Sequence, residues 1–408
     1  MSLPEQTKRG NIFSVMALVA GTCIGGGMLA LPVSTGPSGF IPSLALMTIC
    51  CAFMAITGLL FVEANLWMER GASFVSMAAR LIGPFGKVVV VILFLFIAYA
   101  SLIAYAAGGG DLLILAGKSS SGISLSRSIA CTLFVALFSF VIFLGNKSVG
   151  RVNAILFVGM VVAYGLLVMA GVGEVSGSLL LRASWSEGIA SLPLLLTIFS
   201  YQAIVPSLVI YLDGDGARLR TAIIGGAIIA FVIYALWQAL FLGIVPFEGQ
   251  HGLEEALRLG SSATHSFRHH VVAKWISAVG EFFAFFALVT SFLGIGLGLY
   301  DFLADGLKLR GSRYEKGSLT LLVAIPSLIF AINYPRAFII ALETTGGFGD
   351  TVLNGLIPAL MVWSGRYVQR CKGHFRVWGG RSLLLAIVLF ALFVLGVEIA
   401  ERIRATPL

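Results

Sequence analysis

The chain has 408 residues, of which 58% are hydrophobic and only 11% are charged. Soluble domains carry about 25% charged residues, so this composition excludes a water-soluble globular protein and indicates an integral membrane protein. The formal net charge of +8 raises the question of nucleic-acid binding. The basic residues gather in loops between apolar segments, however, which is a signal of membrane orientation and predicts the bilayer as partner, with no nucleic acid and no obligate protein partner.

Eleven apolar segments follow one another along the chain, and most approach or exceed the roughly 20 residues that span a bilayer as a helix. The loops are short, and the ten-residue alternating pattern of an outer-membrane barrel is absent. We therefore predict an all-α polytopic membrane protein that forms one domain over residues 1–408. The predicted spans are 12–36, 40–67, 86–108, 127–145, 152–173, 190–212, 221–246, 272–303, 317–333, 336–363 and 382–400.

Eighteen of the 27 lysines and arginines fall on one set of alternate loops, beginning with Lys8 and Arg9. The positive-inside rule then predicts a cytoplasmic N-terminus and, with eleven helices, an external C-terminus. No cleavable signal peptide is expected, since the first apolar run is too long for one. The five cysteines show neither a disulfide framework nor metal-ligand spacing, so no cofactor is predicted.

The first apolar segment contains residues 20–32, which read Ala-Gly-Thr-Cys-Ile-Gly-Gly-Gly-Met-Leu-Ala-Leu-Pro. Each glycine costs about 1 kcal/mol of helix propensity relative to alanine. Unwound backbone inside a bilayer is tolerated only where protein or a water-filled cavity satisfies it. The segment therefore predicts a broken helix with a buried polar site, although glycines at this spacing also serve close helix packing.

The sixth segment carries a second interruption, because Pro206 removes a backbone donor and follows Ser200, Tyr201 and Gln202. Two interrupted segments at corresponding positions of two halves are the best sequence pointer to a transporter site. The five-helix offset favours that interpretation over two unrelated kinks.

Two further patterns favour structural explanations. The loop 247–271 holds four of the five histidines but lacks tight metal-ligand spacing, so a solvated outer loop is expected rather than a metal or pH-sensing site. The Gly294–Gly298 GxGxG pattern lies inside an apolar helix with no preceding strand, which indicates helix packing rather than nucleotide binding.

Three motifs resemble one family, the hydroxy and aromatic amino acid permeases, and within it the tyrosine and tryptophan branch. They are the first-helix segment Val19–Pro32, the eighth-helix segment Phe286–Gly306 and the Val205-Pro206-Ser207 step. One departure stands out. Family members commonly carry His-Gly-Ser before the helix-six proline, where this chain has Gln202, Ala203 and Ile204.

The resemblance implies the fold of the amino acid–polyamine–organocation superfamily. Helices 1–5 (residues 11–175) and 6–10 (residues 188–364) would form two inverted repeats, with a peripheral helix at 382–400. It also implies import of an aromatic amino acid, tyrosine first, across the bacterial inner membrane by alternating access with a proton. Tryptophan, phenylalanine, serine or threonine as substrate, and sodium as coupling ion, are the alternatives.

An amino acid zwitterion needs a carboxylate site, an ammonium site and a side-chain pocket. Free N–H groups at a half-helix N-terminus suit the carboxylate, and unwound carbonyls near Ser200 and Tyr201 suit the ammonium. The backbone candidates of helix one are Thr22, Cys23, Gly25, Gly26 and Gly27.

An aromatic substrate needs flat apolar walls and one hydrogen-bonding partner at the tip. Gln202 is the candidate partner for a tyrosine hydroxyl, with an interhelical hydrogen bond as the alternative. The chain has many other aromatic residues that only face lipid or neighbouring helices. The wall candidates are Tyr99, Tyr105, Phe199, Tyr201 and Phe285.

Two kinds of residue could couple transport to a cation. Thr290 and Ser291 resemble the hydroxyl pair that meets helix-one carbonyls, here those of Gly21 and Ile24, at a sodium site in superfamily relatives. Oxygen ligands suit such a hard cation. Intramembrane carboxylates are the alternative, either as proton relays or in a mainly structural role. Glu281 and Asp350 are expected to lie deepest, while Glu343 is a further candidate and Glu63 is expected to anchor a cytoplasmic loop.

Other classes of function fit the sequence poorly. A channel would need a repeated filter or a charged ring, and an enzyme would need a nucleophile–base pair or a metal motif. Neither pattern is visible, so a secondary transporter is the predicted class.

Overall fold

A computed structural model describes residues 10–122, 124–271, 274–307, 315–334 and 336–405. The regular structure in these residues is entirely helical, which confirms the predicted all-α polytopic fold. Lys8 and Arg9, with the basic residues Lys308, Arg310 and Arg313 of the orientation argument, lie outside the described residues.

Most helices follow the predicted segments, but α5 continues 13 residues past the predicted end at 108, and α7 begins six residues before the predicted start at 152. In chain order they are α1 Ile12–Cys23, α2 Gly27–Thr35, α3 Phe40–Leu66, α4 Phe74–Leu81, α5 Pro84–Ser121, α6 Arg127–Leu144, α7 Asn146–Gly171, η1 Val172–Glu174, α8 Gly177–Leu180, η2 Ser186–Ser191, α9 Leu192–Ile198, η3 Gln202–Ile204, α10 Val205–Tyr211, α11 Gly216–Ile244, α12 Leu253–Leu259, α13 Ala263–His270, α14 Lys274–Gly306, α15 Glu315–Asn333, α16 Ala337–Thr344, η4 Thr345–Leu356, α17 Ile357–Trp363, η5 Ser364–Val368 and α18 Gly380–Ala405.

Within the described residues, nine helical spans are long and apolar enough to cross a membrane, and the bent pair α1–α2 makes a tenth. The predicted segment 336–363 corresponds to α16, η4 and α17, and η5 continues the same run of helix without a gap beyond the predicted end. Its middle part, η4, is a π-helix, a rare form that often marks functional sites. The count of eleven spans and the bounds of the two repeats stay predictions.

Polar side chains and glycine set several helix boundaries. Asn11 accepts a hydrogen bond from Phe13 N at 2.9 Å and begins α1, and Asp215 accepts from Ala217 N and Arg218 N to begin α11. Such caps satisfy the orphan N–H groups of a first turn. Gly39 precedes α3 at φ 83°, a left-handed backbone conformation that glycine adopts without strain.

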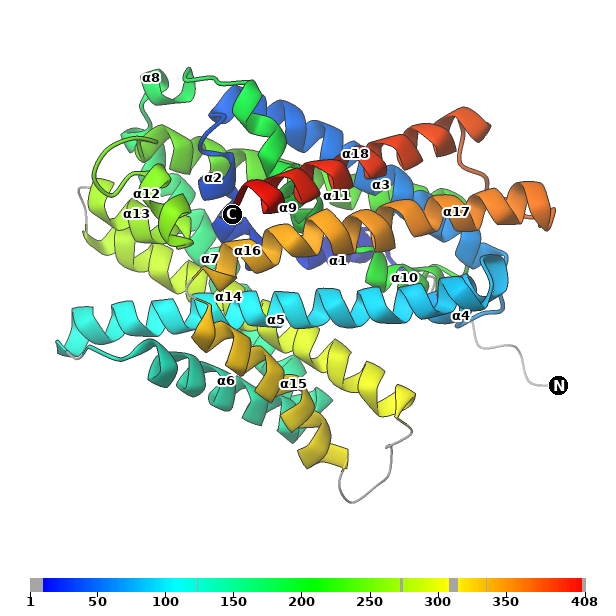
Figure 1. Cartoon of the computed structure of the whole chain (residues 1–408), viewed down its shortest axis with the longest axis horizontal. Helices are drawn as coiled ribbons and strands as arrows, with labels where there is room; N and C mark the ends of the chain where they lie inside the picture. Colours follow the sequence, from blue (N-terminus) through cyan, green and yellow to red (C-terminus); the bar gives the residue numbers. More distant parts are fainter. Residues whose placement is uncertain (1–9, 123, 272–273, 308–314, 335, 406–408) are drawn as a thin grey trace.

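Most long helices lie roughly parallel (Figure 1), with α8, α12 and α13 gathered at one end and α4 at the other. The helix α1 packs along α11, and α9 packs along η4. The helices α6 and α15 lie side by side at one edge of the bundle (Figure 1). This arrangement brings the two interrupted spans into the interior of the protein.

Candidate functional site

The first break separates α1 from α2, whose axes differ by 59°. Gly26 N donates to Ser291 Oγ of α14 at 3.0 Å, and Cys23 O accepts from the hydroxyl of Tyr234 in α11 at 2.5 Å. Polar backbone groups freed inside a membrane must find such partners. Side chains from two other helices therefore sustain this break.

The glycines at the break allow neighbouring side chains to approach the backbone closely. A Cβ atom added to Gly26 would lie 2.6 Å from Tyr105 Cε1, and one added to Gly27 would lie 3.2 Å from Ile198 Cγ2. A Cβ on Gly25 would collide with Ser291 Oγ. Tyr105 and Ser291 thus pack directly on the unwound backbone, as the glycine-rich sequence allows.

The second break lies between α9 and α10, with η3 inserted in it. Here the side chains of the break itself donate hydrogen bonds to another helix, α3. Tyr201 Oη donates to Met54 O of α3 at 3.1 Å, and Gln202 Nε2 donates to the same carbonyl at 3.1 Å and lies 3.3 Å from Thr57 Oγ1. Gln202 Oε1 accepts from Tyr201 N at 3.0 Å. Gln202 is fully buried and uses its amide for these contacts within the protein, which is the interhelical alternative left open by the sequence.

A single hydroxyl joins the two breaks. Tyr234 Oη lies 2.5 Å from Cys23 O and 2.8 Å from Ile198 O, the carbonyls at the ends of α1 and α9. The Tyr234 ring is fully buried and meets Phe199 edge-on at a centroid distance of 5.3 Å. One hydroxyl proton cannot fully satisfy two carbonyls. The interrupted segments are therefore neighbours in space, and Tyr234 is the residue that connects them.

A buried carboxyl group extends the second break toward η4. Asp350 Oδ1 accepts from Ser200 Oγ at 2.8 Å and from Asn354 Nδ2 at 2.6 Å. Asp350 is 1% exposed, and its Oδ2 atom has no hydrogen-bond partner among the described residues. A Cβ on Gly346 would collide with Pro193 O, so η4 lies against α9 at this point. Ser200 and Asp350, predicted for different roles, thus form one cluster.

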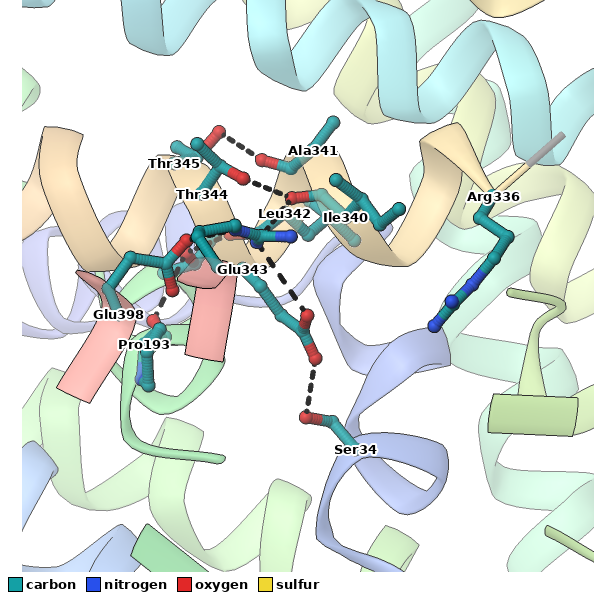
Figure 2. Close-up of polar contacts among 12 residues, drawn as sticks. Ser34, Pro193, Arg336, Ile340, Ala341, Leu342, Glu343, Thr344, Thr345 and Glu398 are labelled. Atoms are coloured by element: carbon teal, nitrogen blue, oxygen red, sulfur yellow. Dashed lines mark hydrogen bonds and ion pairs between the residues drawn. The ribbon is translucent and has the colours of Figure 1, made fainter. Parts of the chain in front are cut away.

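A second polar network joins α2, α16 and α18. Ser34 Oγ donates to Glu343 Oε1 at 3.1 Å, as Figure 2 shows. Arg402 lies 3.9 Å from Glu343 and 2.7 Å from Glu398. Glu343 therefore belongs to an ion-pair network that fastens α2 to the last helices.

Several predicted residues lie away from the breaks. Tyr99 Oη donates to Leu322 O of α15 at 3.0 Å, and Phe285 packs on Phe138 of α6 at a centroid distance of 6.1 Å. Thr22 is exposed, and its hydroxyl donates to Leu18 O of its own helix. The structure does not bring these three side chains to the cluster around Tyr234, so their role in binding stays a prediction.

The proposed hydroxyl pair divides between two environments. Thr290 Oγ1 donates to Phe286 O and Ala287 O of its own helix, whereas Ser291 Oγ contacts the first break. Gly21 packs near Phe157 of α7, and Ile24 packs against the core. Only Ser291 of the pair meets helix one through a hydrogen bond that the structure describes.

Two of the predicted carboxylates, Glu281 and Glu63, face arginines. Glu281 was expected deep in the membrane, but it lies two turns into α14, is 28% exposed and faces Arg268 of α13 at 3.9 Å. The helix α13, which precedes α14, brings this arginine to Glu281, and the depth of Glu281 in the membrane stays a prediction. Glu63 forms a buried ion pair with Arg366 at 2.5 Å and accepts from Val377 N, which agrees with a loop anchor.

The histidines of loop 247–271 form a small aromatic stack at α12 and α13. The rings of His251 and His269 lie 3.9 Å apart and nearly parallel. Partial burial, followed by the neighbouring Arg268, lowers the pKa of His265 below its ordinary value. Among the described residues, no group of three His, Cys, Asp or Glu side chains is placed to hold a metal ion.

Sequence reasoning missed Tyr234 and Asn354. Tyr234 is one of ten tyrosines, and nothing near it in the sequence sets it apart. Asn354 follows Asp350 by four residues, a spacing that places both on one helical face and was a usable signal.

The sequence of the chain is similar to those of known transport proteins. The model of the tryptophan/tyrosine permease family matches residues 8–398. The chain is 33% identical over 401 residues to "Tyrosine-specific transport system 1" of Haemophilus influenzae, covering 96% of this chain and 97% of that protein. It is 30% identical over 400 residues to a "Tryptophan-specific transport protein" of Pseudomonas aeruginosa, covering 95% of each.

Among solved structures, the chain resembles Mhp1, a nucleobase-cation-symport-1 family transporter, in a closed conformation with bromovinylhydantoin bound. The TM-score is 0.65 at 15% identity, with 98% of this chain and 93% of that chain covered. This likeness concerns the fold.

Proposed function

The chain belongs to the tryptophan/tyrosine permease family, and from that premise we propose that it imports tyrosine across the bacterial inner membrane together with a proton. The family resemblance of the sequence is confirmed, and the protein is a multi-pass transporter of aromatic amino acids and not an enzyme. Three statements are proposals: that the substrate is tyrosine, that the coupling ion is a proton, and that the N-terminus is cytoplasmic and the C-terminus outside.

The two breaks suit the charged ends of an amino acid. The helix α2 begins at Gly27, and the positive partial charge at its N-terminal end suits a carboxylate. The carbonyls of Cys23 and Ile198 share the one proton of Tyr234, which leaves acceptor capacity for an ammonium group. Tyr105 and Phe199 flank the same backbone and supply flat walls for a ring. The region between the breaks is the proposed substrate site.

The relatives support an aromatic substrate but divide over which one. The relative named for tyrosine is 33% identical to this chain, and two relatives named for tryptophan are each 30% identical. Tyrosine follows the higher identity, and tryptophan is the second candidate.

Asp350 carries the proposal of proton coupling. It is buried at the second break, one carboxylate oxygen holds Ser200 and the other is unpartnered among the described residues. Ionising a carboxyl group in a low-dielectric interior without a paired cation is expensive, so a proton bound there offsets a large cost. A carboxyl group inside a membrane is a functional candidate by default, with proton relay as a common role. Protonation of Asp350 would alter its hydrogen bond with Ser200 and hence the conformation of the second break.

Proteoliposomes containing the purified protein test the proposal. Uptake of labelled tyrosine is measured under an inward proton gradient, an inward sodium gradient and neither. We expect accumulation with protons alone, and competition by unlabelled tyrosine more strongly than by tryptophan, phenylalanine, serine or threonine. Accumulation with sodium alone would refute proton coupling and would favour a sodium site at Ser291. Stronger competition by tryptophan than by tyrosine would make tryptophan the preferred substrate.

A further inference from the structure

The helices α6 and α15 lie side by side at the edge of the bundle (Figure 1), and their side chains line a groove. Its volume is about 540 Å³, within the roughly 300–1,000 Å³ typical of ligand pockets. The lining is almost wholly apolar and runs from Phe143 and Gly317 at one end to Thr132 and Leu328 at the other. Both helices are apolar enough to span the membrane, so this groove opens toward lipid.

Two hydroxyl groups in the lining have no partner. Ser139 and Thr320 are 5% and 9% exposed, and neither hydroxyl makes a hydrogen bond in the part of the chain that the structure describes. Other hydroxyls of membrane-spanning helices donate to a carbonyl of their own helix, as Thr290 and Ser327 do. A buried hydroxyl group that lacks a hydrogen-bond partner destabilises the protein. Both residues line the groove, so a molecule bound there is placed to supply an acceptor once the hydroxyl groups rotate toward it.

Basic side chains lie near both ends of the groove, but their surroundings differ. Lys147 follows Phe143 by four residues, Lys316 adjoins Gly317, and both lysines are exposed. At the other end, the one flanking arginine, Arg127, is held by Asp111 at 3.0 Å and by carbonyls of Ala331 and Tyr334. The distribution of basic residues assigns the lysine end to the cytoplasmic leaflet, where basic pockets between helices bind anionic headgroups.

The order of these groups along α15 matches the order within a phospholipid. At 1.5 Å per residue, Thr320 lies about 6 Å beyond Lys316 along the helix, and Leu328 lies about 12 Å further on. A phospholipid presents its phosphate first, then its ester carbonyls, then its acyl chains. We propose that an anionic phospholipid of the cytoplasmic leaflet occupies the groove, with phosphate at Lys147 and Lys316, ester carbonyls at Ser139 and Thr320, and an acyl chain beyond them.

Native mass spectrometry of the full-length protein tests this proposal. The protein is exposed to equal amounts of phosphatidylglycerol and phosphatidylcholine with the same acyl chains. We expect the wild type to retain phosphatidylglycerol with about thirtyfold preference, given two lysines near the phosphate. Replacing both lysines (K147Q/K316Q) should abolish the preference, and S139A/T320V should reduce retention of both lipids.

A third variant blocks the groove itself. Ala136 lines it, so Ala136→Phe should remove bound lipid of either kind, whereas Leu137→Phe, on the exposed face of α6 outside the lining, should not. Lys87→Gln on α5 is the matched charge control. Melting temperatures of all variants identify any that fail to fold. Equal retention of the two lipids by the wild type, unchanged lipid binding in Ala136→Phe, or a lipid-free dimer of the chain would overturn the proposal.

Discussion

The two helix breaks differ in which residues contact the rest of the protein. At the first, the local residues are glycines, and the side chains that serve the backbone come from elsewhere, namely Ser291 and Tyr234. At the second, the local side chains Ser200, Tyr201 and Gln202 reach out to α3 and η4. The first break therefore depends on space beside the backbone, and the second depends on specific hydrogen bonds. Substitutions should separate these two dependencies.

The largest effect is expected where space is removed from the first break. Gly26→Leu places a side chain where Tyr105 and Leu288 already lie, 2.6 Å and 3.1 Å from the new Cβ. Uptake of tyrosine should fall to background while membrane insertion stays intact. The assay is uptake by whole cells, with the amount of inserted protein measured by immunoblot.

Gly21→Ala is the matched control, because a Cβ there lies 3.7 Å from the nearest atom of Phe157, an ordinary contact. It should transport like the wild type. Wild-type uptake by Gly26→Leu would remove the substrate site from the first break altogether.

At the second break, the largest effect should follow loss of the Asp350 carboxyl group. Asp350→Asn keeps the shape and a hydrogen-bonding oxygen for Ser200 but cannot gain or lose a proton. We expect loss of proton-driven accumulation with retention of exchange between labelled internal and unlabelled external tyrosine. Both are measured in proteoliposomes.

Glu281→Gln serves as the control for this substitution, since Glu281 is partly exposed and paired with Arg268. It should accumulate tyrosine as the wild type does. Normal accumulation by Asp350→Asn would show that the proton is coupled elsewhere.

A smaller effect should follow loss of the hydroxyl that joins the two breaks. Tyr234→Phe deprives the carbonyls of Cys23 and Ile198 of their shared donor. A loss of about 1 kcal/mol corresponds to roughly a fivefold change in an equilibrium constant. We expect uptake at low tyrosine concentration to fall by about that factor, measured as the ratio kcat/KM of transport.

Tyr99→Phe removes the same chemical group from a carbonyl outside the breaks, that of Leu322. Its transport should change little even if its melting temperature falls. Equal losses of transport in the two variants would mean that Tyr234 acts only on stability.

The contrast between the breaks also explains what the sequence could predict. Three consecutive glycines in an apolar helix have one strong consequence, a loss of helix, so the first break is readable from Gly25, Gly26 and Gly27 alone. Pro206 marks the second break in the same local way. The bounds of most long helices follow from apolar length, whereas α5 continues past the predicted end at 108 through Gly108, Gly109 and Gly110, which the sequence alone marks as poor helix formers.

Partners across the fold could not be derived in that way. Tyr234 meets Cys23 across 211 residues of sequence and Ser200 meets Asp350 across 150. Gln202 has an amide that fits a substrate or a carbonyl equally well, and only the position of Met54 decides which it meets. Such choices depend on tertiary packing, which one sequence does not encode in any local pattern.

The smallest effect concerns the hydrogen bond that joins the first break to α14, and it also distinguishes the two coupling ions. Ser291→Ala leaves Gly26 N without its acceptor, and interhelical hydrogen bonds in membranes contribute about 0.6 kcal/mol on average. We expect roughly a threefold rise in KM for tyrosine. Thr290→Val should have little effect, because that hydroxyl bonds only to its own helix in the described structure. If Ser291 acts through Gly26 alone, its loss has the same effect with and without sodium. If both variants instead lose a sodium-dependent part of uptake, the hydroxyl pair binds the cation, and the first break then serves coupling as well as substrate.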